Sequence, residues 1–145
     1  MMLRVKRLDP RAILPAFAYP GDAGMDLTVI EAVTLKPGEA ADVPTGLAIE
    51  LPLGFWGRIT GRSSTLRKRG LLVNEGVIDQ GYRGPLFVYV KNLNGRTQQV
   101  KPGDRLAQLI VAPLVRPQVM EVEVLGDSIR GDQGFGSSGL RVLGG

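Results

Sequence analysis

The stretch Leu86-Phe87-Val88-Tyr89-Val90-Lys91-Asn92 decides the fold class of this chain. Every second residue from Leu86 to Val90 is aliphatic, and the residues between them are aromatic or charged. Because successive side chains of a β-strand point to opposite faces, this alternation predicts a strand with one face in the core. The segment Gly46–Leu51 carries a similar aliphatic row. Both segments favour a protein whose sheets each bury one face.

Short segments of the same kind fill most of the remaining chain, because 20 glycines and 10 prolines interrupt it at short intervals. The strands expected from these segments are Leu3–Leu8, Met25–Ile30, Ala40–Val43, Gly46–Leu51, Phe55–Gly61, Leu71–Val73, Leu86–Asn92, Gln98–Val100, Arg105–Val111 and Met120–Val124. The sequence therefore predicts an all-β fold, either a sandwich or a jelly roll.

One segment is typical of a short helix. Ser63 and Ser64 offer side-chain caps for a first turn, and the basic run Arg67–Arg69 complements the carboxyl end of the helix dipole. Gly70 suits a left-handed stop. We expect a helix of about two turns between these signals.

Composition limits the chemistry that the chain can perform. It has 145 residues, the length of one domain, and contains neither cysteine nor histidine. An enzyme of this composition has no thiolate nucleophile and no imidazole base, so a carboxylate, a lysine or a metal-held water must act. A metal would be a hard ion bound by oxygen, and Mg²⁺ carried by a phosphate ligand fits best.

The net charge of +4 suits an anionic ligand. The positive residues are scattered except between Arg62 and Arg69, and no aromatic ladder accompanies them, which favours a small phosphate ligand over nucleic acid. The start of the chain does not resemble a signal peptide, and no apolar run is long enough to span a membrane. We therefore expect a cytoplasmic protein without membrane contacts.

Asp79, in the glycine-bounded run Gly76–Gly84, is the best candidate for a catalytic carboxylate. An Asp in such a bend is often only a turn former, whose carboxylate bonds nearby backbone N–H groups. The functional alternative is a partly buried carboxylate that the bend presents to a ligand. The run alone favours the turn former, and other segments change that ranking.

Two segments are suited to binding phosphate. Gly61–Thr65 places two hydroxyls and a guanidinium at the expected helix start, although an ordinary cap without ligand is the alternative. The tail segment Arg130–Gly139 combines glycines and serines with Phe135, whose ring offers a stacking face for a base. A flexible linker is the alternative there, but a spacer gains nothing from an exposed phenyl ring.

Two more polar residues need an explanation. Asp26 stands at the start of an expected strand, after the turn segment Tyr19–Gly24. Gln108 interrupts the apolar run of another strand, and an amide among apolar neighbours needs a hydrogen-bond partner from the backbone or from a ligand.

Taken together and in this order, these segments resemble the trimeric dUTPases. The five motifs of that family correspond here to Asp22–Leu27, Gly61–Gly70, Gly76–Gly84, Gly103–Ile110 and Arg130–Gly139. The resemblance covers roughly residues 1 to 140 and implies a homotrimer of jelly-roll-like subunits. It also implies a β-domain over residues 1–125 and a flexible C-terminal arm over residues 126–145.

The implied reaction is the hydrolysis of dUTP to dUMP and pyrophosphate, which keeps uracil out of DNA and supplies dUMP for thymidylate synthesis. Mg²⁺ would be held by the triphosphate and by waters, with no direct ligand from the protein. Asp79 resembles the residue that orients the attacking water and contacts the 3′-hydroxyl. Tyr82 resembles the residue that packs under the sugar and excludes UTP by steric contact.

The resemblance also assigns substrate contacts in three groups. Uracil is read by the hairpin residues Asn74, Gly76, Val77 and Ile78, with Phe87 close to the base. Phosphates are contacted by Arg62, Ser63, Ser64 and Gln108, with Asp26 in a supporting role. The arm that closes over a site in another subunit contributes Arg130, Phe135, Gly136, Ser137 and Ser138.

The nearest rival is dCTP deaminase, which shares the fold and a similar helix start. Its catalytic glutamate would fall in the strand after Tyr82, yet no carboxylate occurs from Arg83 to Gly103. A deaminase-like or bifunctional enzyme and a phage-type regulatory protein remain as alternatives. The chain also departs from the usual family pattern at several positions, among them Ser64 in the second motif and Pro85 after the third.

Overall fold

The computed structural model describes residues 1–136 and 138–139. The chain divides into two compact units, Met1–Val115 and Arg116–Gly145. The boundary between β-domain and arm was expected after residue 125, ten residues further along, and the extent of the functional arm stays a prediction.

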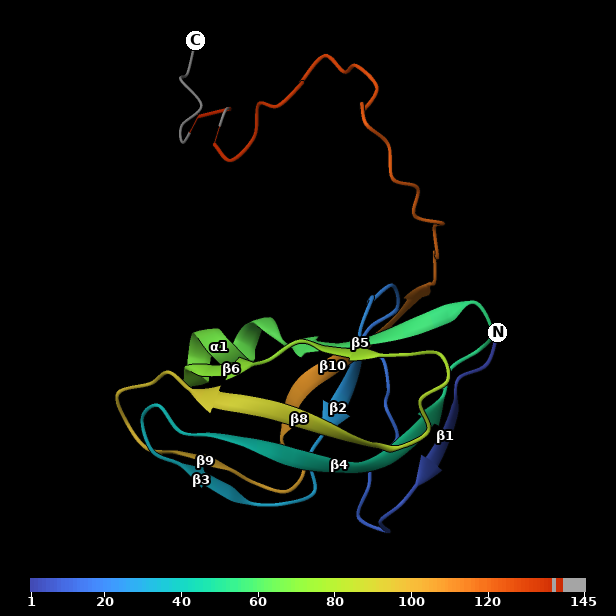
Figure 1. Cartoon of the computed structure of the whole chain (residues 1–145). Coiled ribbons are helices and arrows are strands. Elements are labelled where there is room, and N and C mark those ends of the chain that lie inside the picture. Colours follow the sequence, from blue (N-terminus) through green and yellow to red (C-terminus); the bar gives the residue numbers. More distant parts are fainter. Residues whose placement is uncertain (137, 140–145) are drawn as a thin grey trace. The chain divides into compact units, whose positions relative to one another are not determined.

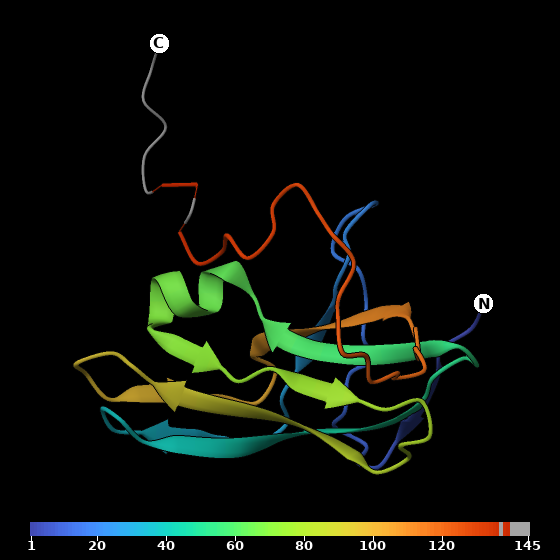
Figure 2. The same cartoon turned by 45° about the horizontal axis from the view of Figure 1, so that its top comes forward.

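Two antiparallel sheets pack face to face in the first unit (Figures 1 and 2). One sheet has the order β1-β4-β8-β6, formed by Arg4–Arg7, Ala40–Glu50, Pro85–Asn92 and Leu71–Val73. The other has the order β2-β10-β5-β7, formed by Met25–Thr28, Arg105–Pro113, Phe55–Gly61 and Gly76–Ile78. A small third sheet pairs β3, Val33–Leu35, with β9, Gln98–Val100. The expected all-β architecture is confirmed.

The core lies between the two large sheets and follows the alternation of β8. Leu86, Val88 and Val90 are fully buried, whereas the residues between them are exposed. Leu27 and Leu109, from the facing sheet, belong to the same buried cluster. Each such side chain stabilises the fold by about 1.5–3 kcal/mol relative to exposure, so these rows hold the two sheets together.

The strand boundaries differ from expectation in three ways. The two segments expected around residue 45 form one continuous strand, β4, which bends at an irregularity between Pro44 and Ala48. Strands β3 and β7 were not among the expected strands. The strand expected at Met120–Val124 is wrong, because the single chain forms no strand there. A strand needs a partner for its backbone groups, and no described strand pairs with that segment.

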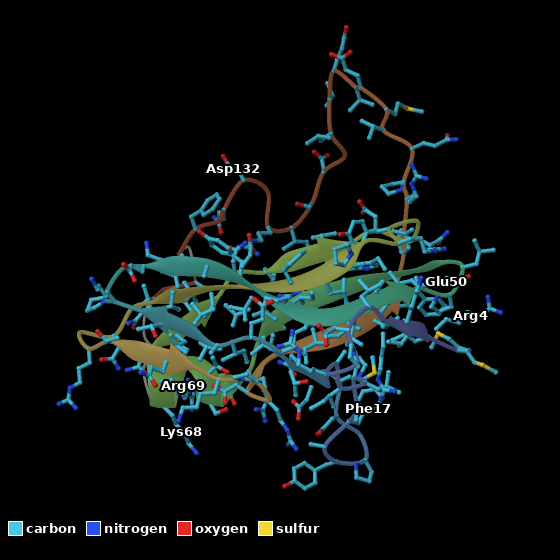
Figure 3. The ribbon with its side chains drawn as sticks, turned by 90° about the horizontal axis from the view of Figure 1, so that it is seen from below. Arg4, Phe17, Glu50, Lys68, Arg69 and Asp132 are labelled. Carbon is cyan, nitrogen blue, oxygen red and sulfur yellow. The ribbon has the colours of Figure 1, made fainter. Side chains whose placement is uncertain are left out.

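The expected helix is present as α1, Ser63–Arg69, and ends at Gly70 in the left-handed conformation. Its start differs, because Arg62 takes the cap position and no side-chain capping bond forms. Instead, the buried Thr65 hydroxyl donates to the Leu106 carbonyl at 2.9 Å. At the other end Arg69, labelled in Figure 3, pairs with Asp104 at 3.0 Å. Both contacts fix α1 to the β10 region.

The second unit contains turns but neither helix nor strand in its described residues. Ser128 and Arg130 each join a turn, since the Gly131 N–H donates to the Ser128 hydroxyl and the Gln133 N–H donates to the Arg130 carbonyl. In the described part of the whole chain, no helix has the length and apolar character needed to cross a membrane.

Candidate active site

A charged cavity opens on the outer face of the second sheet. Gln108 on β10 lies opposite Asp26 on β2 and Thr60 on β5, while the next pair, Leu109 and Ile59, is buried in the core. Because neighbours in register share a face, Gln108 and Asp26 point away from the core. The cavity encloses about 340 Å³, and five of the predicted site residues line it: Asp26, Arg62, Ser63, Ser64 and Gln108.

Asp26 organises the positive charge in this cavity. Its carboxylate lies 2.9 Å from Arg62 Nε and 3.6 Å from Arg105 Nη1, and its side chain is only 16% exposed. Arg62 Nη1 also donates to the Arg105 carbonyl at 3.1 Å. Two guanidinium groups face one carboxylate, so the cluster keeps a net positive charge and its geometry is fixed before an anion binds.

Gln108 has the backbone partner that its apolar neighbourhood requires, because its Nε2 donates to the Gly61 carbonyl at 3.1 Å. Its amide lies directly over Gly24, where a Cβ would stand 2.3 Å from Oε1. Gly24 is therefore part of the site. It lies in the segment Asp22–Leu27, of which only Asp26 was predicted to contribute. One amide hydrogen of Gln108 is left for a ligand.

A second cavity of about 260 Å³ opens where the edges of the two sheets meet. Its walls include core residues of both sheets, Ile59 and Leu86. Six predicted site residues line it: Gly76, Val77, Ile78, Asp79, Tyr82 and Phe87. Asn74 does not line it, since its side chain donates to the Glu75 carbonyl at 3.2 Å and its N–H donates to Tyr89.

The Asp79 carboxylate is exposed, contrary to the expected partial burial. Its backbone closes a turn, because the Tyr82 N–H donates to the Asp79 carbonyl at 3.0 Å. Two aspartates that close turns, Asp22 and Asp104, each accept a backbone N–H at 2.9 Å. Among the described residues, no group makes such a bond to the Asp79 side chain. The structure thus favours a carboxylate free for a ligand over a turn former.

The backbone of β7 completes this second cavity. This strand lies at the edge of its sheet and pairs only with β5, Val77 standing opposite Arg58. An edge strand presents N–H and C=O groups that its neighbour does not use. Those groups are suited to hydrogen-bonding the edge of a planar base.

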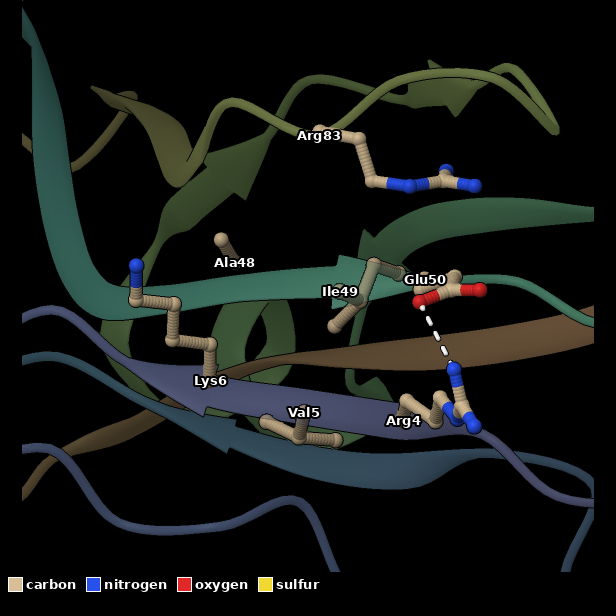
Figure 4. A pocket seen from close by; sticks show the side chains of 7 residues that line it. All are labelled: Arg4, Val5, Lys6, Ala48, Ile49, Glu50 and Arg83. Carbon is tan, nitrogen blue, oxygen red and sulfur yellow. Dashed lines mark hydrogen bonds and ion pairs between the residues drawn. The ribbon is translucent and has the colours of Figure 1, made fainter.

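Arg83 follows Tyr82 directly but serves a different cavity. Its guanidinium donates to the Gln80 and Tyr82 carbonyls and lies above β4, on the side of the Glu50 carboxylate (Figure 4). Glu50 in turn pairs with Arg4 at 3.5 Å. Arg83 therefore stiffens the turn after Asp79 without entering the Asp79 cavity.

The two site cavities share no lining residue. One opens on the outer face of a sheet and the other at an edge between the sheets. The residues predicted to act on one substrate are therefore divided, on a single chain, into two separate groups.

The predicted arm residues lie in the second unit. Phe135 is fully exposed and has a φ of 47°, a left-handed conformation uncommon for an aromatic residue. Arg130 Nε donates to the Gln133 carbonyl, and Gly136 and Ser138 are exposed. Ser137 lies outside the described residues.

The family model of the dUTPases matches residues 11–139. The chain belongs to the dUTPase family. It is 49% identical to the deoxyuridine 5′-triphosphate nucleotidohydrolase of Leifsonia xyli over 89% of this chain and 87% of that protein. The Rhodococcus erythropolis protein of the same name is 46% identical, over 99% and 89%.

Solved structures agree with this dUTPase assignment. A mutant dUTPase of Staphylococcus bacteriophage 80alpha, solved with dUpNHpp, superposes with a TM-score of 0.90 at 31% identity, covering 96% of this chain and 99% of that one. A mutant dUTPase from phage phi11 of S. aureus, solved to show a structural Mg(II) ion, has a TM-score of 0.80 at 30% identity over 88% and 100%.

Acidic side chains are the usual protein ligands of a hard metal ion, and Asp26 is the one that belongs to the ion-pair cluster of the charged cavity. Within residues 1–136 and 138–139, no group of three or more Asp or Glu residues is placed to hold a metal ion. Both carboxylate oxygens of Asp26 already face arginines. This donor set fits Mg²⁺ that arrives on a triphosphate and keeps its waters, the usual arrangement for that ion.

Proposed function

We propose that this dUTPase hydrolyses dUTP to dUMP and pyrophosphate by attack of a water, oriented by Asp79, on the α-phosphorus. The observation that carries the proposal is the Asp79 carboxylate, which is exposed in a cavity and lacks a partner among the described residues. Such a carboxylate is available to accept a hydrogen bond from the attacking water and to align it. Acting on dUTP, the enzyme would keep uracil out of DNA and supply dUMP for thymidylate synthesis.

The charged cavity would hold the triphosphate. Arg62 offers its guanidinium, Ser63 and Ser64 offer hydroxyl groups, and Gln108 offers the amide hydrogen that Gly61 does not use. Asp26 keeps Arg62 in place through the 2.9 Å ion pair. Phosphoryl transfer depends mainly on positioning and on charge stabilisation, which these residues provide without histidine or cysteine.

The second cavity would select the nucleoside. The free edge of β7, Gly76–Ile78, would read uracil through its backbone, and Tyr82 would lie under the sugar and exclude a 2′-hydroxyl. Phe87 lines the same cavity near the base. Asn74 would contribute backbone rather than side-chain contacts, because its amide is engaged with Glu75.

Mg²⁺ would enter with the substrate, bound by triphosphate oxygens and waters, and would neutralise part of the phosphate charge. Asp26 would stay on Arg62 rather than ligate the ion directly. The arm residues Arg130, Phe135, Gly136, Ser137 and Ser138 would close over the nucleotide, exclude water and stack a ring on uracil.

A homotrimer would unite the two cavities. The site residues are divided between an outer sheet face and a sheet edge. This division supports an active site in which one subunit supplies the charged cavity, with Arg62, and another supplies the second cavity, with Asp79. Phe87 and Tyr89 also leave aromatic surface exposed on the outer side of β8, as a subunit contact would require.

Pyrophosphate release from dUTP, UTP, dTTP and dCTP tests the activity. We expect pyrophosphate release from dUTP and much slower release from UTP and dTTP. The 2′-hydroxyl of UTP would meet Tyr82, and the 5-methyl group of dTTP would point toward β7. No release from dUTP would overturn the proposal. Ammonia release from dCTP would instead support the deaminase alternative.

Mixed trimers test the shared site. Asp79→Asn and Arg62→Ala chains, each impaired alone, should gain activity when co-folded. Some sites then combine an intact Asp79 from one chain with an intact Arg62 from another. Differently tagged chains would show by capture that mixed trimers form. Captured mixed trimers without recovered activity would contradict a site built from two subunits.

A further inference from the structure

Tyr82 is held at its cavity by two neighbours that have no assigned role. Its hydroxyl donates to the Pro85 carbonyl at 2.9 Å, across the intervening Gly84. A Cβ on Gly84 would stand 2.4 Å from the Tyr82 hydroxyl oxygen and 2.6 Å from the carbon that bears it. The end of the ring therefore lies directly over the bare Cα of Gly84.

The backbone around this contact is also fixed. The Tyr82 N–H closes the turn to Asp79 at 3.0 Å, and the Gly54 N–H donates to the Gln80 side chain, which attaches the turn to the loop before β5. Pro85 begins β8 opposite Ala48 of β4. Proline has no N–H, but its carbonyl is free to accept the Tyr82 hydroxyl.

We propose that Gly84 and Pro85 are positioning residues that set the sugar specificity of this enzyme by locking the Tyr82 ring. The proposal rests on the proposed role of Tyr82 in excluding a 2′-hydroxyl. A tyrosine that is 41% exposed would otherwise sample several side-chain rotamers, and a ring that moves aside leaves room for ribose. The bond to Pro85 fixes the ring, and the absence of a Cβ at Gly84 makes that position accessible.

The same cavity places Asp79 beside this locked ring. The turn from Asp79 to Tyr82 and the bond from Tyr82 to Pro85 form one continuous unit. The ring position that excludes ribose is thus set by the segment that also presents the catalytic carboxylate, so specificity and water alignment share a single support.

Four variants test this inference through the ratio of kcat/KM for dUTP to kcat/KM for UTP. Tyr82→Phe keeps the ring and removes the hydroxyl, and we expect the ratio to fall about 3- to 10-fold, the value of one neutral hydrogen bond. Gly84→Ala displaces the ring end and should lower the ratio at least as much, with a raised KM for dUTP.

Gly95→Ala is the matched control, because Gly95 lines neither site cavity and a Cβ there meets no atom within 4 Å. Its ratio and its KM should equal those of the parent enzyme. Thermal unfolding and trimer size are measured for every variant, and Tyr82→Phe, which only deletes an exposed hydroxyl, keeps the test valid if Gly84→Ala does not fold.

Tyr82→Ala separates the proposed lock of the ring from the proposed role of Tyr82 in sugar selection. If its ratio falls while Tyr82→Phe and the folded Gly84→Ala keep the parent ratio, the lock is refuted and the sugar role of Tyr82 stands. If Tyr82→Ala also keeps the parent ratio, the ring does not select the sugar, and both the lock and that part of the proposed function are wrong.

Discussion

The charged cavity around Asp26 and the second cavity, which contains Asp79, are held together by different interactions. The first depends on side chains from distant parts of the chain, with Asp26 tied to Arg62 and Arg105 by ion pairs. The second depends on a local turn and an edge strand, and its carboxylate has no partner in the described residues. The first resembles a preformed anion cradle, and the second leaves its reactive group free.

This difference follows from the tasks proposed for the two cavities. A triphosphate carries several charges, and its receptor gains when the opposing charges are fixed in advance. A group that aligns water must keep its hydrogen-bonding capacity open, so a satisfied Asp79 would be a poor catalyst. Three predictions test this division, and a fourth concerns a paired carboxylate outside both cavities; they follow in order of decreasing effect.

Asp79→Asn should produce the largest loss. Removing the charge of the group that aligns the water should lower kcat by about 10³-fold, within the range for general bases, with a small change in KM. Single-turnover measurements with dUTP would show the loss in the chemical step. Glu31→Gln removes a carboxylate charge at an exposed position outside both cavities; it is the control and should retain parent kinetics. Normal pyrophosphate release by the Asp79 variant would refute the proposed mechanism.

Arg62→Ala should weaken both substrate binding and turnover. The loss of a charge-assisted bond to phosphate corresponds to roughly 10- to 150-fold in kcat/KM. Asp26→Asn keeps the Arg62 guanidinium and weakens only its ion pair and that of Arg105, so it should cost less. Arg67→Ala removes the same charge from α1, the helix that follows Arg62, without touching the ion-pair cluster. Equal losses in the Arg62 and Arg67 variants would mean that net charge, rather than the cluster, binds the substrate.

Gly24→Ala should disturb the charged cavity through Gln108. The added Cβ would overlap Oε1, so the amide must leave the Gly61 carbonyl, and we expect KM to rise about 10-fold, the value of a lost polar contact. Gly95→Ala, where a Cβ meets nothing within 4 Å, provides the control. A parent-like KM in the Gly24 variant would show that Gln108 does not contact the substrate.

Asp9 should give the smallest effect, and it illustrates a partly exposed carboxylate that does have a partner. The Arg11 side chain, and then its N–H, donate to Asp9 and hold its pKa below the ordinary value of 3.8. Because the folded pKa is depressed, the stabilisation is present above about pH 4 and is lost as the pH falls through the folded value. Asp9→Asn should therefore lower Tm slightly at pH 7 and leave it unchanged in strong acid. An equal change at both pH values would contradict this linkage.

Much of the fold could be predicted because the alternation in β8 and the glycine stop of α1 are local signals. Gly70 adopts the expected left-handed conformation, and the aliphatic row of β8 is buried as expected. The strand at Met120–Val124 was wrong because alternation predicts a strand only where another strand is available to pair with it. The helix start also differed, since Thr65 found a tertiary partner in place of a local serine cap.

The candidate site was predicted through its motifs, and the structure corrected its physical details. Asp79 was expected to be partly buried and is exposed. The Asn74 side chain donates to the Glu75 carbonyl, and its contact with the substrate stays a prediction. No individual role was predicted for Gly24 or for the Pro85 carbonyl. Their importance arises from atoms that meet only after folding, Gln108 over Gly24 and Tyr82 over Gly84.

The sequence by itself determined the class of fold, the family and the absence of imidazole and thiol chemistry, because residue types, their spacing and their periodicity are properties of the chain. Only the tertiary structure decided which groups meet. It placed Asp26, Arg62 and Gln108 in one cavity and Asp79 and Tyr82 in another, since sheet order and register bring distant segments together. That division follows from the packing of the two sheets, which no local pattern encodes.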